Sequence, residues 1–195
     1  MSNKNTITPL LPDKYYHIYN YCNDHNEIFL NRNFYLLFLE KYDEYLSDYL
    51  DTYAYCILPD HFHFLVRIKP NHLFSNGLGA SNQLRKFFIS YSLCLNKRAG
   101  RSDPISKKYY RKVEVDTTED LKQMIMYIHY NPQKHGVCKS FDQYYFSSFK
   151  ALVKPCNTKL RKKEVLSWFN GLEGFLKYHW YLSHKQEFMK MALED

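Results

Sequence analysis

The stretch TYAYCILPDHFHFLVRI, residues 52–68, decides the fold of this chain. Its two halves, 52–58 and 62–68, are rich in aromatic, aliphatic and β-branched residues, which are typical of strands with a buried face. Between the halves lie Pro59 and Asp60, two residues that favour turns. The pattern predicts a β-hairpin.

Two histidines stand at the start of the second predicted strand. Side chains alternate across a strand, so His61 and His63 project from one face, and Phe62 and Phe64 project from the other. Two imidazoles on a rigid strand can bind one metal ion. The same pattern is more often a hydrogen-bonded or solvated histidine pair, so the pattern alone does not establish a metal site.

The residues on either side of the hairpin predict further strands and helices. Apolar residues at spacings of three and four indicate amphipathic helices, and β-rich segments between turn residues indicate strands. We predict a strand at 15–21, helices at 33–49 and 81–98, a strand at 109–115, and a helix from 116 that ends at Pro132. This order predicts an α+β fold: a ferredoxin-like βαββαβ antiparallel sheet with helices on one face, then the helix from 116 and a short helical C-terminal extension.

Length and cysteine content narrow the class of protein. The chain has 195 residues, which is enough for one ordinary domain with a core that needs no disulfide bonds. No signal peptide and no apolar run of membrane-spanning length occur, so we expect a cytoplasmic protein without a membrane partner. The cysteines are odd in number and form no Cys-x-x-Cys motif, which argues against a disulfide framework and a thiolate zinc site: Cys22, Cys56, Cys94, Cys138 and Cys156.

Charge and aromatic content favour a nucleic-acid partner. The formal net charge is +7, and aromatic residues make up 18% of the chain, with 19 tyrosines. Basic charge attracts polyanions, and aromatic rings stack on unpaired bases. Solvated lysines and tyrosines in the core would give the same composition, so composition alone does not decide the question.

A second candidate motif, YIHYNP at residues 127–132, lies at the end of the helix predicted from 116. Tyr127 and Asn131 are four residues apart and therefore share one face of that helix. An amide oxygen is a suitable third ligand for a divalent ion that two histidines hold incompletely. An aromatic and a polar residue at this spacing are more typical of an ordinary helix face, and Asn before Pro often ends a helix.

Four blocks together resemble a known family. They are YHIYN at 16–20, LPDHFHFLV at 58–66, YIHYNPQKHGV at 127–137 and YFSSF at 145–149. The same blocks occur in this order in the REP-associated tyrosine transposases, which belong to the single-tyrosine HUH transposases. The resemblance covers residues 14–152, so it implies a transposase domain there and a basic, aromatic, helical extension at 153–195.

The resemblance implies a transposase that cleaves and rejoins single-stranded DNA at hairpin-bearing, palindromic ends. Tyr127 would be the nucleophile and would form a covalent 5′-phosphotyrosine. A divalent metal ion, Mg²⁺ or Mn²⁺, held by His61, His63 and Asn131, would polarise the scissile phosphate. Such a protein would associate with the nucleoid when bound to DNA.

Other functions stay open. A domesticated DNA hairpin-binding protein would keep the fold without the reaction, and a metal-dependent phosphoesterase would use activated water and form no covalent intermediate. A monomer and a homodimer are both compatible with the sequence.

Three residues near the motifs raise alternatives. Relatives commonly carry Asn where this chain has Asp60, an acid that could bind a second cation or stabilise the turn. Tyr130 is an alternative nucleophile, although the match to the family and the spacing to Asn131 favour Tyr127. His129 should point away from both and lie at the surface or contact a phosphate.

Basic and aromatic residues supply candidate DNA contacts. The extension could clamp DNA through Trp168 and Trp180, or these residues could pack on the main domain. Candidate contacts to the DNA backbone, which a solvated basic surface would also explain, are Arg85, Lys107, Lys108, Arg111, Lys112, Arg161, Lys162 and Lys163.

Overall fold

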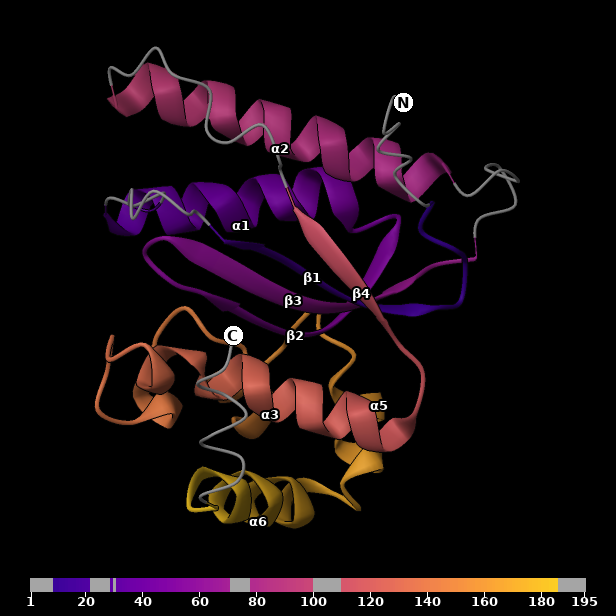
Figure 1. Cartoon of the computed structure of the whole chain (residues 1–195), viewed down its shortest axis with the longest axis vertical. Coiled ribbons are helices and arrows are strands. Elements are labelled where there is room, and N and C mark those ends of the chain that lie inside the picture. The colour runs from indigo at the N-terminus through magenta and orange to yellow at the C-terminus, as the bar shows by residue number, and fades with distance from the viewer. Residues whose placement is uncertain (1–8, 22–28, 30, 71–77, 100–109, 186–195) are drawn as a thin grey trace, which may run out of the picture.

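An antiparallel β-sheet separates two layers of helices (Figure 1). The computed structural model describes residues 9–21, 29, 31–70, 78–99 and 110–185. Within these residues the sheet has four strands in the order β2-β3-β1-β4, and each neighbouring pair is antiparallel. This is the strand order of a ferredoxin-like sheet, so the predicted fold class is confirmed.

The strands and helices follow one another in the predicted order. Helices α1 and α2 cover one face of the sheet, and α3 with α5 and α6 lies on the other side (Figure 1). None of the helices in the described residues has the length and apolar composition needed to cross a membrane. The elements are β1 (Tyr15–Tyr21), α1 (Arg32–Leu46), β2 (Leu50–Ile57), β3 (His61–Ile68), α2 (Leu78–Ala99), β4 (Arg111–Val115), α3 (Thr118–Lys134), the 3₁₀ helix η1 (Phe141–Gln143), α4 (Phe149–Val153), α5 (Lys162–Trp168) and α6 (Leu172–Ser183).

The alternation along β3 produces a core on each side of the sheet. Phe62 and Phe64 belong to the core beneath α1 and α2, where the ring of Phe38 lies 5.2 Å from that of Phe62. Leu65 belongs to the opposite core, with Ile125 of α3. Because β3 is an interior strand with helices on both sides, nearly all of its residues are buried.

Helix α3 runs through Pro132 and ends after Lys134, so the prediction that Pro132 ends the helix is wrong. Proline removes only one hydrogen bond in the last turn, and a Schellman motif closes the helix instead. The amide of Val137 donates to the carbonyl of Pro132 at 2.8 Å, and Gly136 adopts a φ of 68°. The additional turn keeps Asn131 inside the helix.

The C-terminal helices share a core with α3. Phe175 of α6 and Val165 of α5 are fully buried beside Ile125. Trp168 stacks on Tyr53 of β2 with a centroid distance of 5.1 Å, which is the packing role that the sequence left open. The boundary predicted between 14–152 and 153–195 stays a prediction.

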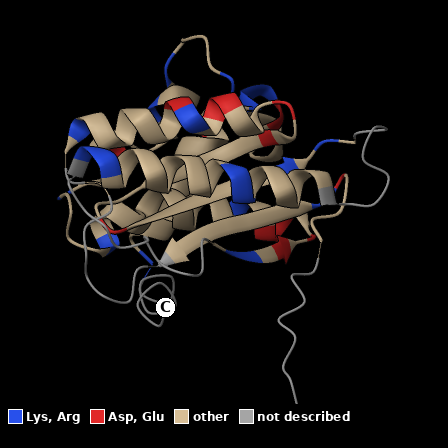
Figure 2. Ribbon diagram, turned by 90° about the horizontal axis from the view of Figure 1, so that it is seen from above, with Lys and Arg blue, Asp and Glu red and all other residues tan. Residues whose placement is uncertain are grey.

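Lysine and arginine residues are spread over many elements. In the view of Figure 2 they are interleaved with aspartate and glutamate residues along the helices. Arg85, a predicted DNA contact, is exposed on α2, in the layer on the opposite side of the sheet from α3. Because basic and acidic residues alternate in this view, Figure 2 shows no surface made mainly of lysine and arginine.

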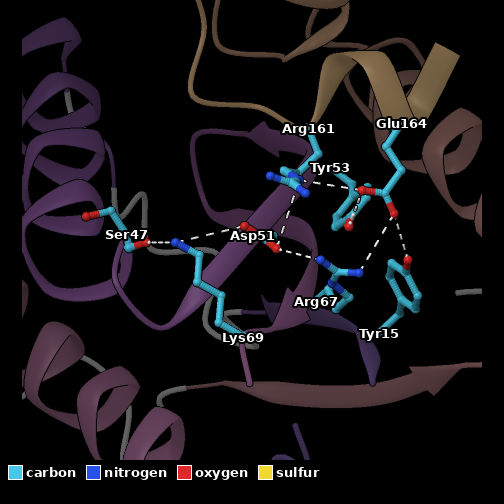
Figure 3. Close-up of polar contacts among 8 residues, drawn as sticks. All are labelled: Tyr15, Ser47, Asp51, Tyr53, Arg67, Lys69, Arg161 and Glu164. Atoms are coloured by element: carbon cyan, nitrogen blue, oxygen red, sulfur yellow. Dashed lines mark hydrogen bonds and ion pairs between the residues drawn. The ribbon is translucent and has the colours of Figure 1, made fainter. Parts of the chain in front are cut away.

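An ion-pair cluster, called the clasp here, fastens α5 to the sheet (Figure 3). It consists of Asp51, Arg67, Arg161 and Glu164. Asp51 accepts a hydrogen bond from Arg67 at 2.9 Å and lies 4.0 Å from the guanidinium of Arg161. Glu164 lies 3.5 Å from Arg161. Glu164 also accepts hydrogen bonds at 3.0 and 2.9 Å from the phenols of Tyr15 and Tyr53.

Candidate active site

A cleft of about 780 Å³ opens between the sheet and α3. Strand β3 contributes His61 and His63 to its lining, and α3 contributes Tyr127 and Lys134. Strand β1 contributes His17 and Tyr19, and the edge strand β4 contributes Arg111 and Val113. The two candidate ligand histidines and the candidate nucleophile Tyr127, which is more than sixty residues away from them in the chain, thus line one cavity.

The predicted placement of the two histidines on one face is confirmed. The rings of His61 and His63 lie 5.2 Å apart between centroids, at an interplanar angle of 90°. Their exposed fractions are 2% and 5%. The ring of Tyr127 stands 5.5 Å from that of His63, also at 90°, and remains partly exposed to the cleft.

Asn131 lies one helical turn after Tyr127 and is fully buried. Its amide nitrogen donates to the carbonyl of Tyr127 at 2.8 Å, which orients the side chain. The oxygen Oδ1 of Asn131 and the nitrogen Nε2 of His63 are buried and have no hydrogen-bond partner among the described residues. Buried polar atoms are rarely left this way, and a nitrogen and an amide oxygen are suitable ligands for Mn²⁺ or Mg²⁺.

A metal site at the two histidines would need the side-chain amide of Asn131 or an oxygen atom of a substrate as a further ligand. Among the described residues, no group of three or more His, Cys, Asp or Glu side chains is arranged to hold a metal ion. His61 and His63 would therefore need Asn131 or oxygen atoms of a substrate to complete the coordination. Asn131 is not among the residues that line the cleft, so it would approach such an ion from within the protein.

Tyr130, the alternative nucleophile, faces the core. Its exposed fraction is 2%, and its ring packs 6.2 Å from that of Phe141. Burial raises the pKa of the Tyr130 phenol. Residues three and four positions apart lie on opposite sides of the first residue's axis line on a helix. Tyr127 therefore lies close to Asn131 and lines the cleft, whereas Tyr130 is turned towards the core and does not line it.

Comparisons with known proteins show what the chain is similar to in sequence and in fold. No protein-family model matches the chain. A curated protein of Haemophilus influenzae (strain ATCC 51907 / DSM 11121 / KW20 / Rd), named as a REP-associated tyrosine transposase, is 26% identical over 143 residues, which are 62% of this chain and 80% of the relative. A solved structure of a REP-associated tyrosine transposase bound to a REP hairpin superimposes with a TM-score of 0.56 at 19% identity and covers 78% of this chain and 86% of that one. The chain resembles the REP-associated tyrosine transposases in sequence and in fold.

The resemblance to the REP-associated tyrosine transposases is confirmed. Asp60, where relatives commonly carry Asn, contacts one of the two candidate ligand histidines. Oδ1 of Asp60 lies 2.6 Å from Nδ1 of His61. This hydrogen bond is the main cause that lowers the pKa of the Asp60 carboxyl group. Neither alternative derived from the sequence, a second cation or a turn, included this contact with a predicted ligand.

His129 is fully buried, so the prediction of a surface or phosphate-contacting residue is wrong. Its Nδ1 lies 2.9 Å from Nε2 of His179 in α6, and its Nε2 lies 2.8 Å from the hydroxyl of Ser148. Because Nδ1 of His179 must donate to the carbonyl of Phe175, Nε2 of His179 accepts from His129, and His129 accepts from Ser148. The Ser148 hydroxyl accepts in turn from the amide of Tyr55 at 2.9 Å. This chain of hydrogen bonds joins the helix of Tyr127 to α6 and β2.

Acid should destabilise the protein through His179. Burial lowers the pKa of His179 to about 4, below the ordinary 6.5. The unfolded chain therefore binds the proton first, and stability is lost as pH falls from about 6.5 towards 4. We expect this residue to reduce the free energy of unfolding by roughly 2 kcal/mol between pH 7 and pH 5. Urea denaturation at both pH values measures the loss, and His179→Gln should remove that part of it; an unchanged difference in the variant would contradict the assignment.

The predicted DNA contacts fall in different environments. Arg111 is exposed and lines the cleft. Arg161 is held in the clasp, and the ammonium group of Lys162 donates to the carbonyl oxygens of Ala151 and Lys154. Lys163 is exposed on α5, and Lys112 lies 5.6 Å from the ring of Tyr16 on the other face of the sheet. Lys107 and Lys108 lie outside the described residues.

Among the cleft residues that were not predicted, His17, Lys134 and His135 contact the predicted site residues. Nε2 of His17 lies 2.9 Å from Nδ1 of His63, and the ammonium group of Lys134 lies 5.1 Å from the centre of the Tyr127 ring. The ring of His135 packs 4.6 Å from that of His61. Extending the helical pattern beyond Pro132 would have placed Lys134 and His135 near Asn131, whereas His17 required the register between β1 and β3.

Proposed function

We propose that the protein is a metal-dependent transposase that cleaves and rejoins single-stranded DNA at hairpin-bearing, palindromic ends. The observation that supports this most is the position of Tyr127, whose ring stands 5.5 Å from that of His63 in the same cleft as His61. The sequence similarity to a REP-associated tyrosine transposase supports the same class of substrate. The monomer and the homodimer both stay open.

The reaction needs one nucleophile and one leaving group. The phenolic oxygen of Tyr127 forms a bond to the scissile phosphorus, the bond from phosphorus to the 3′ oxygen breaks, and that oxygen takes up a proton and leaves as a 3′-hydroxyl. The product is a 5′-phosphotyrosine, which another 3′-hydroxyl can attack to rejoin strands without ATP. His61, His63 and Asn131 would hold Mg²⁺ or Mn²⁺, which supplies charge stabilisation for the phosphate.

Two basic side chains of the cleft suit the charge of this substrate. The ammonium group of Lys134 lies against the Tyr127 ring, where a cation favours negative charge on the phenolic oxygen or on the phosphate beside it. Arg111 lies at the edge of the sheet, where it can contact the DNA backbone.

A covalent adduct tests the proposal. The full chain is incubated with Mn²⁺ and hairpin oligonucleotides built from REP-type palindromic repeats, labelled at either end. We expect a protein–DNA adduct that survives denaturation, retains only the label on the 3′ side of the cut, and disappears with a chelator. Cleavage without an adduct would indicate a phosphoesterase, and hairpin binding that ignores the chelator without cleavage would indicate a non-catalytic binding protein; either result contradicts the proposal.

Arg111 and Arg161 provide a matched pair for DNA binding. Arg111→Gln should weaken hairpin binding about threefold to tenfold and reduce the salt dependence by about one phosphate contact. Arg161→Gln makes the same change of charge in the clasp, so it should leave affinity within about twofold and lower stability by roughly 1 kcal/mol. Fluorescence anisotropy at several salt concentrations and urea denaturation measure the two effects. Equal losses of affinity in both variants would contradict the distinction.

A further inference from the structure

The two candidate ligand histidines differ in what holds their second ring nitrogen. Nδ1 of His61 lies 2.6 Å from a carboxylate oxygen of Asp60, and Nδ1 of His63 lies 2.9 Å from Nε2 of His17. Both contacts engage Nδ1, so in both rings Nε2 is the nitrogen left to face a metal ion. The partners have different chemistry, because one is an anion and the other is a neutral ring at ordinary pH.

Asp60 determines where His61 carries its proton. An ionised carboxylate only accepts hydrogen bonds, so Nδ1 of His61 must donate. The neutral ring then has its lone pair on Nε2, as a metal ligand requires. A carboxylate partner on the outer nitrogen also holds the ring in the orientation that a metal ligand needs.

His17 can do the same for His63 in only one arrangement. One proton lies between the two facing nitrogens: either Nδ1 of His63 donates to His17, or Nε2 of His17 donates to His63. The second arrangement leaves neutral His63 with a buried N–H on Nε2, and the structure offers that atom no acceptor among the described residues. The first leaves a lone pair there. The His17 side chain is nearly buried, with an exposed fraction of 6%, and its ring stacks on that of Tyr19 with a centroid distance of 4.7 Å. Both features fix its position for this contact.

We propose that Asp60 and His17 are positioning residues, which fix the ring orientation of His61 and His63 and the tautomer with the lone pair on Nε2 for a divalent ion. The inference rests on the proposed metal ion of the transposase site and adds two residues outside the ligand set. Asp60 carries a full charge, so we expect the larger effect from it.

Mn²⁺ binding by the full chain without DNA tests the inference, with free Mn²⁺ measured by electron paramagnetic resonance. Asp60→Asn keeps an acceptor atom but removes the charge, and His17→Phe keeps a buried ring but removes the acceptor. We expect His17→Phe to bind Mn²⁺ about 10-fold more weakly and Asp60→Asn more weakly still, both within the roughly 10- to 100-fold range of such outer contacts. Asp116→Asn is the matched control, because it removes an exposed carboxylate from the same cleft without touching a histidine, and it should stay within about twofold of wild type.

The protons can also be observed directly. In ¹⁵N spectra of the imidazoles of the wild-type chain with Mg²⁺, His61 and His63 should both carry hydrogen on Nδ1. A hydrogen on Nε2 of His63 would overturn the role of His17, and this measurement decides the matter even if His17→Phe does not fold.

The outcomes separate this inference from the proposed function. If His61→Ala and His63→Ala bind Mn²⁺ as wild type does, the metal site itself is wrong. If those two variants lose binding while Asp60→Asn and His17→Phe retain wild-type affinity, only the positioning role is wrong.

Discussion

Tyr127→Phe should abolish the covalent protein–DNA adduct while hairpin binding stays within about twofold of wild type. The substitution removes the phenolic oxygen of the proposed nucleophile and keeps the ring, which packs 5.5 Å from that of His63. Residual adduct should fall below about one part in a thousand, because a missing nucleophile cannot be replaced by positioning alone. Gel analysis after denaturation measures the adduct, and anisotropy measures binding.

Tyr130→Phe is the matched control for that experiment. It removes a hydroxyl group three residues away on a side chain that lies in the core, so adduct formation should persist at a rate close to wild type. A variant Tyr127→Phe that still forms adduct, paired with an inactive Tyr130→Phe, would reverse the assignment of the nucleophile. If both variants form adduct, neither phenol is the nucleophile.

His129→Leu should produce the largest loss of stability among substitutions near the site. It leaves Nε2 of His179 and the hydroxyl of Ser148 buried without their partner, and each unsatisfied group costs about 1–3 kcal/mol. We expect a total loss of roughly 3 kcal/mol and a fall in Tm of about 6–12 °C. Chemical denaturation followed by circular dichroism measures the change.

A suitable control for His129→Leu is His184→Leu, which makes the same substitution at an exposed position just after α6. It should change stability by less than about 0.5 kcal/mol. Equal losses in the two variants would mean that the hydrogen bonds around His129 do not stabilise the fold.

The part of the site that follows local periodicity could be predicted from the sequence. Alternation along residues 61–64 places both histidines on one face, and the spacing of four places Tyr127 beside Asn131 on α3. The order of strands and helices, and with it the ferredoxin-like sheet, could be predicted for the same reason, because each helix or strand has its own spacing of apolar residues. None of these predictions depends on contacts between segments that are distant in the sequence.

The rest depends on contacts between distant segments. In the register between β1 and β3, Tyr19 stands directly opposite His63, so His17, two residues earlier on the same face, is its diagonal neighbour and forms a hydrogen bond with it. No local pattern in the sequence reveals this register. His129 was wrongly expected at the surface because the helix that covers it, α6, begins more than forty residues later. Lys134 was missed because Pro132, read as a stop, lies inside the last turn of α3.

The clasp has a consequence for the order of events during synthesis. Arg161 and Glu164 leave the ribosome long after the strands that they fasten, and Val165 and Phe175 complete the core against which α3 rests. A nascent chain that stops short of α5 has the histidines and Tyr127 but leaves the back of α3 uncovered. The core between the sheet and α3 should therefore reach its final packing only once α5 and α6 have been made.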